Sequence, residues 1–239
     1  MIEAHLLKLR KRDEISADEE AAIRGAVSDV RRIPADSVAI PAGKELNESM
    51  LLVSGWMARA KDLRGGARQI IELHVAGDFA DLHSFTLKRL DHDVLTVTQC
   101  TIAIVPHANL KKITEQHPHL TRVYWFLTNL DAAIHRERAL SLGARSAISR
   151  TAHLMCEMFV RLEIVGLTAH NGYDFPLTQQ ELSESLGLTS VHVNRMLQEL
   201  RRRKVIRLEN RRLEILDPAE LRRIAEFDPA SLYLEKKAR

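Results

Sequence analysis

The sequence predicts an α+β protein in three parts, and three patterns along its 239 residues carry that prediction. Short apolar runs separated by turn residues fill much of the first half, which is typical of a β sandwich or roll. From His117, about 25 residues then place apolar side chains at helical spacing. The last part combines two short helices around a glycine with two strands. We therefore expect a β-rich domain, one long helix and a small mixed domain, in that order.

Composition and charge are those of an ordinary globular protein. Hydrophobic residues make up 45% of the chain, and no apolar run approaches the length that crosses a bilayer. The first 14 residues mix charges with leucines and show no cleavage site, so we expect a cytoplasmic protein without a membrane partner. The net charge of +3 is only mildly basic, but arginines cluster between Arg195 and Arg212.

The first element in chain order is a helix that begins after Ser16. Ser16 and Glu19 have the spacing of a capping box, and the helix should end near Ala26. The pattern then changes to short strands between turn signals such as Pro41-Ala42-Gly43. The expected strands are 38–40, 50–53, 70–73, 94–97 and 102–105. Together they predict a jelly-roll-like β-roll.

The long helix that follows carries one apolar seam. The seam consists of Leu120, Val123, Leu127, Leu130 and Ile134. Such a stripe needs a partner, which is either the same helix of a second subunit or the helix's own domain. Gly143 interrupts the pattern and Ser146 can cap a new helix, so we expect the hinge there. The predicted division is residues 1–115, 116–145 and 146–239.

Two short helices around Gly187 form the most informative motif. Thr178 and Glu181 have capping-box spacing, and Gly187 suits the left-handed residue that ends a helix. Thr189 can cap the second helix, whose Val193, Met196, Leu197 and Leu200 should face a core. This is the sequence form of a helix-turn-helix, in which the second helix enters the major groove of DNA. A plain helical hairpin with a solvated polar face is the alternative.

The outward side of the second helix supplies candidate DNA contacts. Arg195 has the fork that matches guanine, Asn194 can bond adenine, and Val191 can contact a thymine methyl. The residues expected at base edges are Ser190, Val191, His192, Asn194 and Arg195. Segments 205–208 and 213–216 read as two strands of a wing, before Asp217 and Pro218 open a last helix. The residues expected at phosphates are Thr178, Gln179, Thr189, Arg201, Arg207, Arg211 and Arg212.

The region from Pro176 to Pro218 resembles the DNA-binding domain of the Crp/Fnr family of bacterial transcription regulators. The resemblance rests on the T-Q-Q-E-L opening, the G-L-T turn, V-N-R in the second helix and the I-R-L and L-E-I-L segments of the wing. The β-rich part resembles the cyclic-nucleotide-binding-like β-roll of that family, with Pro41-Ala42-Gly43 and Ala76-Gly77-Asp78-Phe79 at its turns. The resemblance implies a winged helix-turn-helix and a homodimer joined through the long helix. RNA polymerase is a further partner that it implies.

An effector pocket is expected at Gly77, Asp78, Asp91 and His92. In the resembled phosphate cassette a Gly-Glu pair opens the site, and an arginine followed by serine or threonine closes it. Gly77-Asp78 keeps the opening, but Asp91 and His92 stand at the closing positions, where a carboxylate repels phosphate. We therefore expect no useful affinity for cyclic AMP.

Other cofactors fit the residues less well. An iron–sulfur cluster requires about four thiolates, whereas the chain has Cys100 and Cys156, which we expect to be reduced. A haem ligand among His74, His83, His92 and His107 stays an alternative, as does a cyclic-nucleotide response. Asp81, His83, Asp91, His92 and Asp93 match no metal-site spacing. The expected cofactor set is empty.

These observations predict a regulator that binds double-stranded DNA sequence-specifically as a homodimer and is not an enzyme. A metal-dependent cupin-like enzyme is the second hypothesis. Its only His-x-His, at His117 and His119, precedes the long helix instead of lying on a strand. The third hypothesis is a helix-turn-helix that contacts protein, and the basic second helix and wing argue against it.

Overall fold

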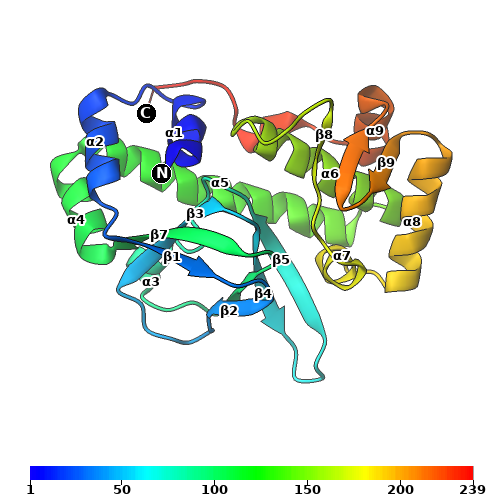
Figure 1. The fold of residues 1–239 in the computed structure, drawn as a ribbon, viewed down its shortest axis with the longest axis horizontal. Coiled ribbons are helices and arrows are strands. Elements are labelled where there is room, and N and C mark those ends of the chain that lie inside the picture. Colours follow the sequence, from blue (N-terminus) through cyan, green and yellow to red (C-terminus); the bar gives the residue numbers. More distant parts are fainter. Residues whose placement is uncertain (239) are drawn as a thin grey trace. The chain divides into compact units, whose positions relative to one another are not determined.

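The computed structural model describes residues 1–238, and the chain divides into two compact units (Figure 1). Unit 1 comprises Met1–Lys61, Glu72–Ala133 and the segment from Tyr233, and unit 2 comprises Asp62–Ile71 and Ile134–Leu232. Strand β5 (Arg68–His74) and helix α5 (Pro118–Gly143) contribute residues to both units. The expected α+β class, with a β-roll, a long helix and a helix-turn-helix, is confirmed.

Two antiparallel sheets form the roll. Their strand orders are β1-β7-β3 and β2-β6-β4-β5. The strands other than β5 are β1 (Asp29–Ile33), β2 (Ser37–Ile40), β3 (Glu48–Ser54), β4 (Met57–Asp62), β6 (Asp93–Thr96) and β7 (Cys100–Pro106). The five predicted strands are present, while β1 and β4 were missed. β1 is exposed and arginine-rich, and β4 carries a buried arginine at Arg59, so neither shows an apolar run.

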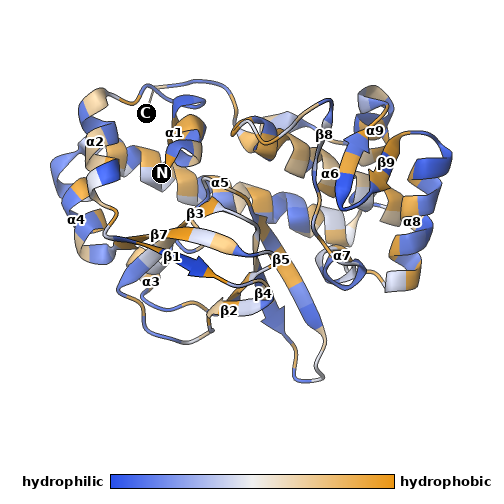
Figure 2. Ribbon diagram, in the orientation of Figure 1, coloured by the Kyte–Doolittle hydropathy of each residue, from blue (hydrophilic) through white to orange (hydrophobic). Residues whose placement is uncertain are grey.

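The middle strand of the first sheet is β7, which pairs with β1 and β3 through registers such as Asp29↔Ile104 and Met50↔Ile104. β7 is largely hydrophobic along its length (Figure 2). Its side chains alternate between two cores because successive residues of a strand point to opposite faces. Ile102 and Ile104 join a cluster with Met57 and Val94, whereas Ala103 and Val105 join a second cluster.

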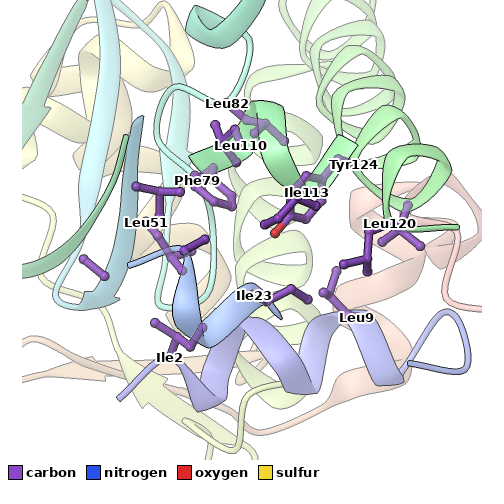
Figure 3. Close-up of a cluster of buried hydrophobic side chains, with 14 of the residues drawn as sticks. Ile2, Leu9, Ile23, Leu51, Phe79, Leu82, Leu110, Ile113, Leu120 and Tyr124 are labelled. Carbon is purple, nitrogen blue, oxygen red and sulfur yellow. The ribbon is translucent and has the colours of Figure 1, made fainter. Parts of the chain in front are cut away.

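The second cluster lies between the roll and helices of unit 1. Besides α5, these helices are α1 (Glu3–Arg10), α2 (Ala17–Gly25) and α4 (His107–Gln116), and a short α3 (Ser84–Leu87) follows β5. Figure 3 shows Phe79 and Leu51 of the roll facing Leu110, Ile113 and Tyr124 of the helices. The predicted capping box of α2 is present, because Ser16 accepts from the Glu19 N–H and the Glu19 carboxylate accepts from Ser16.

Unit 2 is built around α6 (Ala147–Glu163), which packs against the helices α7 (Gln179–Leu186), α8 (Ser190–Arg202) and α9 (Pro218–Ala225). A short 3₁₀ helix, η1 (Pro229–Leu232), follows α9. Ser146 caps α6 as expected by accepting from the Ser149 N–H, and α5 ends at Gly143. The predicted wing strands are β9 (Ile206–Glu209) and β10 (Arg212–Ile215), and a third strand, β8 (Gly172–Asp174), pairs with β10.

Candidate nucleic-acid interface

The turn between α7 and α8 has the predicted local geometry. The Thr178 hydroxyl accepts from the Glu181 N–H at 3.2 Å, and the Glu181 carboxylate accepts from the Thr178 N–H at 2.7 Å. Gly187 ends α7 in the left-handed conformation with φ +59°, which favours glycine. Thr189 then caps α8 by accepting from the His192 N–H at 3.3 Å. Caps and glycine therefore fix where each helix begins and ends.

Helix α8 is anchored by one face. Val193, Leu197 and Leu200 are buried as predicted, and Met196 is half-buried. Since α8 contacts both α6 and α7, this apolar face orients the helix relative to the rest of unit 2. The opposite face is consequently fixed in direction and open to solvent.

The open face of α8 carries the residues expected at base edges. Val191 is 81% exposed, Arg195 is exposed, and Ser190, His192 and Asn194 are half-buried. An apolar side chain with so large an exposed fraction gains by contacting an apolar partner. All five candidates thus lie within the first two turns of α8, which is where base-contacting residues of a recognition helix lie.

Two side-chain pairs hold this face together. The side-chain amides of Asn194 and Gln179 bond each other reciprocally, at 2.9 and 3.1 Å. Arg195 lies 2.6 Å from His192, measured from Nη2 to Nε2. The first pair joins α8 to the start of α7, a contact that the sequence did not reveal because the two residues lie in different helices. Asn194 must exchange its bond to Gln179 for any bond to adenine.

The wing arginines are partly engaged within the protein. Arg207 pairs with Glu214 at 2.7 Å, and Arg212 lies 3.4 Å from Asp174 and donates to the Ala169 carbonyl. Arg211 occupies the tight turn between β9 and β10 with φ +58°, where its side chain is exposed. Of the predicted phosphate ligands in the wing, Arg211 is the one without an ion pair among the described residues.

The remaining predicted phosphate ligands lie at helix ends. Thr178 and Thr189 use their hydroxyls as caps, Gln179 is exposed at the start of α7, and Arg201 donates to the Leu208 carbonyl at 2.9 Å. Arg202 and Arg203 both bond Glu199, and this pairing lowers the pKa of the Glu199 carboxyl to about 2. The surface is therefore basic but includes internal ion pairs.

The first half of the predicted effector pocket is covered by the N-terminal helix. The His5 Nδ1 bonds the Gly77 carbonyl at 2.9 Å, and the Lys8 ammonium bonds Asp78 at 2.5 Å. Gly77 has φ +88°, and a Cβ there would lie 2.7 Å from the backbone of Ala4. Gly77 and Asp78 thus contact α1 instead of lining an open phosphate site, which corrects the prediction for these two residues.

The second half of the predicted pocket, Asp91 and His92, has other partners. Lys61 bonds Asp91 at 2.7 Å, and His92 lies 2.9 Å from the same carboxylate. Lys61 and His92 lower the pKa of Asp91, whereas burial lowers the pKa of His92. The Asp91 carboxylate therefore stays charged at neutral pH.

Inside the roll lies an arginine that the sequence analysis did not select. Arg59 is 1% exposed, and its guanidinium bonds Glu72 at 2.6 Å, Asp131 at 2.7 Å and the Ala80 carbonyl at 2.8 Å. Two carboxylates thus neutralise this cation. The sequence does contain a sign of this buried arginine, because Arg59 stands among the apolar residues Met57, Ala58 and Ala60 of β4.

The two cysteines, one in the roll and one on α6, and two histidines of the roll are buried. Cys100 and Cys156 are free and buried, and burial raises the pKa of Cys156 to about 12. His107 bonds Ser49 and Ser84, and His74 is buried beside Glu72. Within residues 1–238, no group of three or more His, Cys, Asp or Glu side chains has the arrangement of a metal site. None of the helices so described has the length and hydropathy to cross a membrane.

The predicted subunit seam of α5 faces inward over its first part. Leu120 and Val123 are buried in the cluster of unit 1, and Leu127 packs against it. Ile134 is likewise buried and Leu130 is half-buried. Leu120 and Val123 are therefore not available to a second subunit, which corrects the prediction for these two residues. These two residues instead pack against the helix's own domain, which was the alternative.

A different stripe of α5 is exposed. It recurs at alternating steps of three and four residues and consists of Arg122, Trp125, Asn129, Ala132, Arg136 and Ala139. Trp125 is 68% exposed. Trp125 is the only large apolar member of this stripe, so apolar periodicity does not predict it, although the spacing itself is visible in the sequence.

Comparisons with known proteins agree with this geometry. A family model described as a Crp-like helix-turn-helix domain matches residues 149–224. A probable transcriptional activator of Rhizobium leguminosarum bv. viciae is 32% identical over 197 residues, which cover 81% of this chain and 80% of the relative. The transcriptional activator protein FnrL of Cereibacter sphaeroides is 28% identical over 81% of this chain and 79% of its own.

A solved structure shares the fold. The structure of FixK2 from Bradyrhizobium japonicum superposes with a TM-score of 0.76 at 21% identity, covering 83% of this chain and 97% of that one. Fold, capped helix-turn-helix and relatives together define a transcriptional regulator with a helix-turn-helix DNA-binding domain. The chain belongs to the Crp/Fnr family. It is accordingly a regulator and not an enzyme.

Proposed function

We propose that this protein binds a pseudo-palindromic DNA site as a homodimer in the cytoplasm, and that α8 reads the bases. The observation that carries this proposal is the open face of α8, where Val191 and Arg195 project from a helix whose other face is buried. In a two-fold dimer the recognition helices enter successive major grooves, with half-sites about 34–36 Å apart. Residues 1–115 would serve as the sensor, 116–145 as the dimer helix and hinge, and 146–239 as the DNA-binding domain.

The exposed stripe of α5 is the surface we propose for the subunit contact. Alternating steps of three and four residues are those of a helix that pairs with another helix. Trp125 supplies a large apolar side chain, while Ala132 and Ala139 leave room for close approach. Leu127 and Leu130 would contribute from the edges of this stripe.

Dimerisation is tested by sedimentation of Trp125→Glu. Trp125 supplies the large apolar side chain of the stripe, so a carboxylate in its place removes the main apolar contact, and this variant should sediment as a monomer where the wild type sediments as a dimer. Leu87→Glu is the matched control, because Leu87 is an apolar residue of α3 that is 62% exposed and does not belong to the stripe. If Trp125→Glu stays dimeric, the stripe is not the interface.

We propose an effector other than cyclic AMP, or none, and no iron–sulfur cluster. Arg59 is already paired with Glu72 and Asp131, and α1 covers Gly77 and Asp78, so a phosphate entering there would meet carboxylates and a guanidinium that is already neutralised. Cys100 and Cys156 are buried among packed residues, where ligation of a cluster would require unpacking. Calorimetry with cyclic AMP should give no saturable heat at micromolar concentration, and a saturable isotherm would contradict this part of the proposal.

The decisive test of DNA reading is selection of random duplex DNA by the purified protein without added ligand, followed by sequencing. A palindromic motif with two half-sites is the expected result. Arg195→Ala serves as the companion variant and should lose preference at one position of each half-site. If the protein is folded and dimeric but enriches no motif, it does not bind DNA specifically without a ligand. The selection would then be repeated with candidate effectors present. RNA polymerase is the partner we expect for DNA-bound protein.

A further inference from the structure

A small cavity lies inside unit 2, where the end of α5 meets α6 and α7. Its volume of about 10 Å³ is close to the space that one water molecule needs. Its polar lining comes from three helices: Arg138 and Ser141 of α5, Arg150, His153 and Glu157 of α6, and Ser185 of α7. An occupant would therefore contact all three helices at once.

Several buried polar atoms of this lining have no hydrogen-bond partner among the described residues. They are Nε and Nη2 of Arg138, Nε of Arg150, Nε2 of His153 and Oγ of Ser185. Arg138, His153 and Ser185 are 8%, 4% and 2% exposed. A buried donor without an acceptor destabilises the fold, because the hydrogen bond to water that it loses is not replaced. Their concentration around one cavity indicates an occupant that accepts hydrogen bonds.

The charge around the cavity is positive. Arg150 donates to the carbonyls of Leu186, Leu142 and Arg145, at 2.5, 3.1 and 3.3 Å, so its bonds in residues 1–238 end on neutral oxygens. Glu157 is bonded by Arg161 at 2.8 Å and lies 3.8 Å from Arg138 without a hydrogen bond.

The second carboxylate of this region is also occupied. Glu137 Oε2 is paired with Arg145 at 3.0 Å and lies 3.5 Å from His153 Nε2. Two glutamates therefore stand against four arginines, which leaves two positive charges. Burial and the neighbouring Arg145 lower the pKa of His153 to about 4, so this ring adds one N–H donor but no charge near neutral pH.

We propose that the cavity binds a single chloride-sized anion, held by Arg138, His153 and Ser185 beside the charge of Arg150. An anion accepts all the unpartnered N–H and O–H groups, and it also offsets the excess positive charge. A water molecule would satisfy some of the donors but leave the charge uncompensated. The anion would join the end of α5 to α7 and so stiffen the hinge against the helix-turn-helix. This inference does not depend on dimerisation or on DNA specificity.

Crystals of the full-length protein grown in sodium bromide provide the direct test, because bromide gives an anomalous signal and water does not. We expect an anomalous peak within hydrogen-bonding distance of Arg138 and Ser185. Density without anomalous signal in this cavity would identify a water molecule and overturn the proposal.

Thermal unfolding gives the solution test, with sodium chloride compared against sodium gluconate at equal ionic strength. Ligands that bind only the folded state raise Tm, and we expect a rise of roughly 2–4 °C in chloride for the wild type. Arg138→Gln should abolish the rise. Ser185→Ala removes one hydroxyl with little change of volume and should reduce it, even if Arg138→Gln does not fold.

Arg223→Gln is the matched control, since Arg223 is an exposed arginine of α9 paired with Glu220. It should keep the full chloride shift. Equal Tm values of the wild type in both salts, or the same shift in Ser185→Ala as in the control, would overturn the proposal.

Discussion

Arginine has opposite roles in the roll and on the reading helix. Arg59 is 1% exposed, and its guanidinium donates hydrogen bonds to Glu72, Asp131 and the Ala80 carbonyl. Arg195 is exposed and has only the neighbouring His192 as a side-chain contact within the described residues. The same side chain is thus closed off by carboxylates in one unit and left open in the other.

Because Arg59 is buried and Arg195 is exposed, substitutions of the two arginines should be detected by different measurements. A buried charge that loses its partners destabilises the fold, because the remaining charges cannot be hydrated. An exposed charge contributes little to stability and is available to an external ligand. The roll should therefore respond to charge removal in unfolding experiments, and α8 should respond in binding experiments.

The largest expected effect is that of Arg59→Met. Glu72 and Asp131 would lose their cation, and Glu72 is fully buried, so the free energy of unfolding should fall by about 3–5 kcal/mol. Urea unfolding followed by circular dichroism measures this loss. Arg223→Met is the exposed control and should change stability by about 1 kcal/mol or less. Equal losses in the two variants would remove the contrast between buried and exposed arginines.

Arg195→Ala tests whether the exposed arginine of α8 contributes to DNA binding. It should weaken binding to the selected DNA site by about 1–3 kcal/mol and relax specificity at one base pair of each half-site. Fluorescence anisotropy with single-base variants of the site measures both changes. Its stability should match the wild type, because Arg195 is exposed. An unchanged binding profile would exclude Arg195 from base reading.

The contact between α1 and the Gly77 turn gives a pH dependence. Burial lowers the pKa of His5 to about 4, below the ordinary value of about 6.5 that it regains on unfolding. The unfolded chain then binds the proton more tightly, so stability is present above the ordinary pKa and is lost as the pH falls. We expect His5 to cost roughly 1–2 kcal/mol of stability between about pH 7 and about pH 5.

His5→Asn tests this dependence, because an asparagine amide can donate to the Gly77 carbonyl without titrating. Urea unfolding at both pH values should show a smaller loss for His5→Asn than for the wild type. If the two proteins lose the same stability, His5 does not stay neutral in the folded state.

The smallest expected effect is that of Arg211→Ala at the wing turn. A single exposed phosphate contact should weaken binding by no more than about 1 kcal/mol, equally for all sequences, and lower the slope of log K against log salt by about one. A salt titration of DNA binding measures the slope. Arg207→Ala, whose side chain already pairs with Glu214, should change the slope less. A larger change for Arg207 would reverse this ranking of the wing arginines.

The local signals of the sequence were sufficient for much of the interface. Thr178, Glu181 and Gly187 act within a few residues of one another, so their spacing alone predicts where α7 begins and ends. Val193, Leu197 and Leu200 are periodic within one helix, which predicts the buried face of α8 and hence its open face. The strand and turn patterns likewise predicted the wing and the roll, and the family resemblance agreed with both.

The errors arose where a contact joins distant segments. Arg59 and Asp131 lie 72 residues apart, and His5 and Gly77 are separated by the same interval, so neither pair leaves a local pattern. Helical periodicity identified an apolar face of α5, but periodicity alone does not show which surface packs against that face. For Leu120 and Val123 that surface is the core of the same chain.

Element types, the ends of the capped helices and the family can be predicted from the sequence, because they follow from interactions within a helix turn or from motif residues. Tertiary structure alone decided that α1 covers the Gly77 turn and that Arg59 is neutralised inside the roll. It also decided that α5 turns Trp125 outward. The physical reason is that burial and ion pairing depend on which elements meet in space, and two faces of one helix are distinguished only by what packs against them.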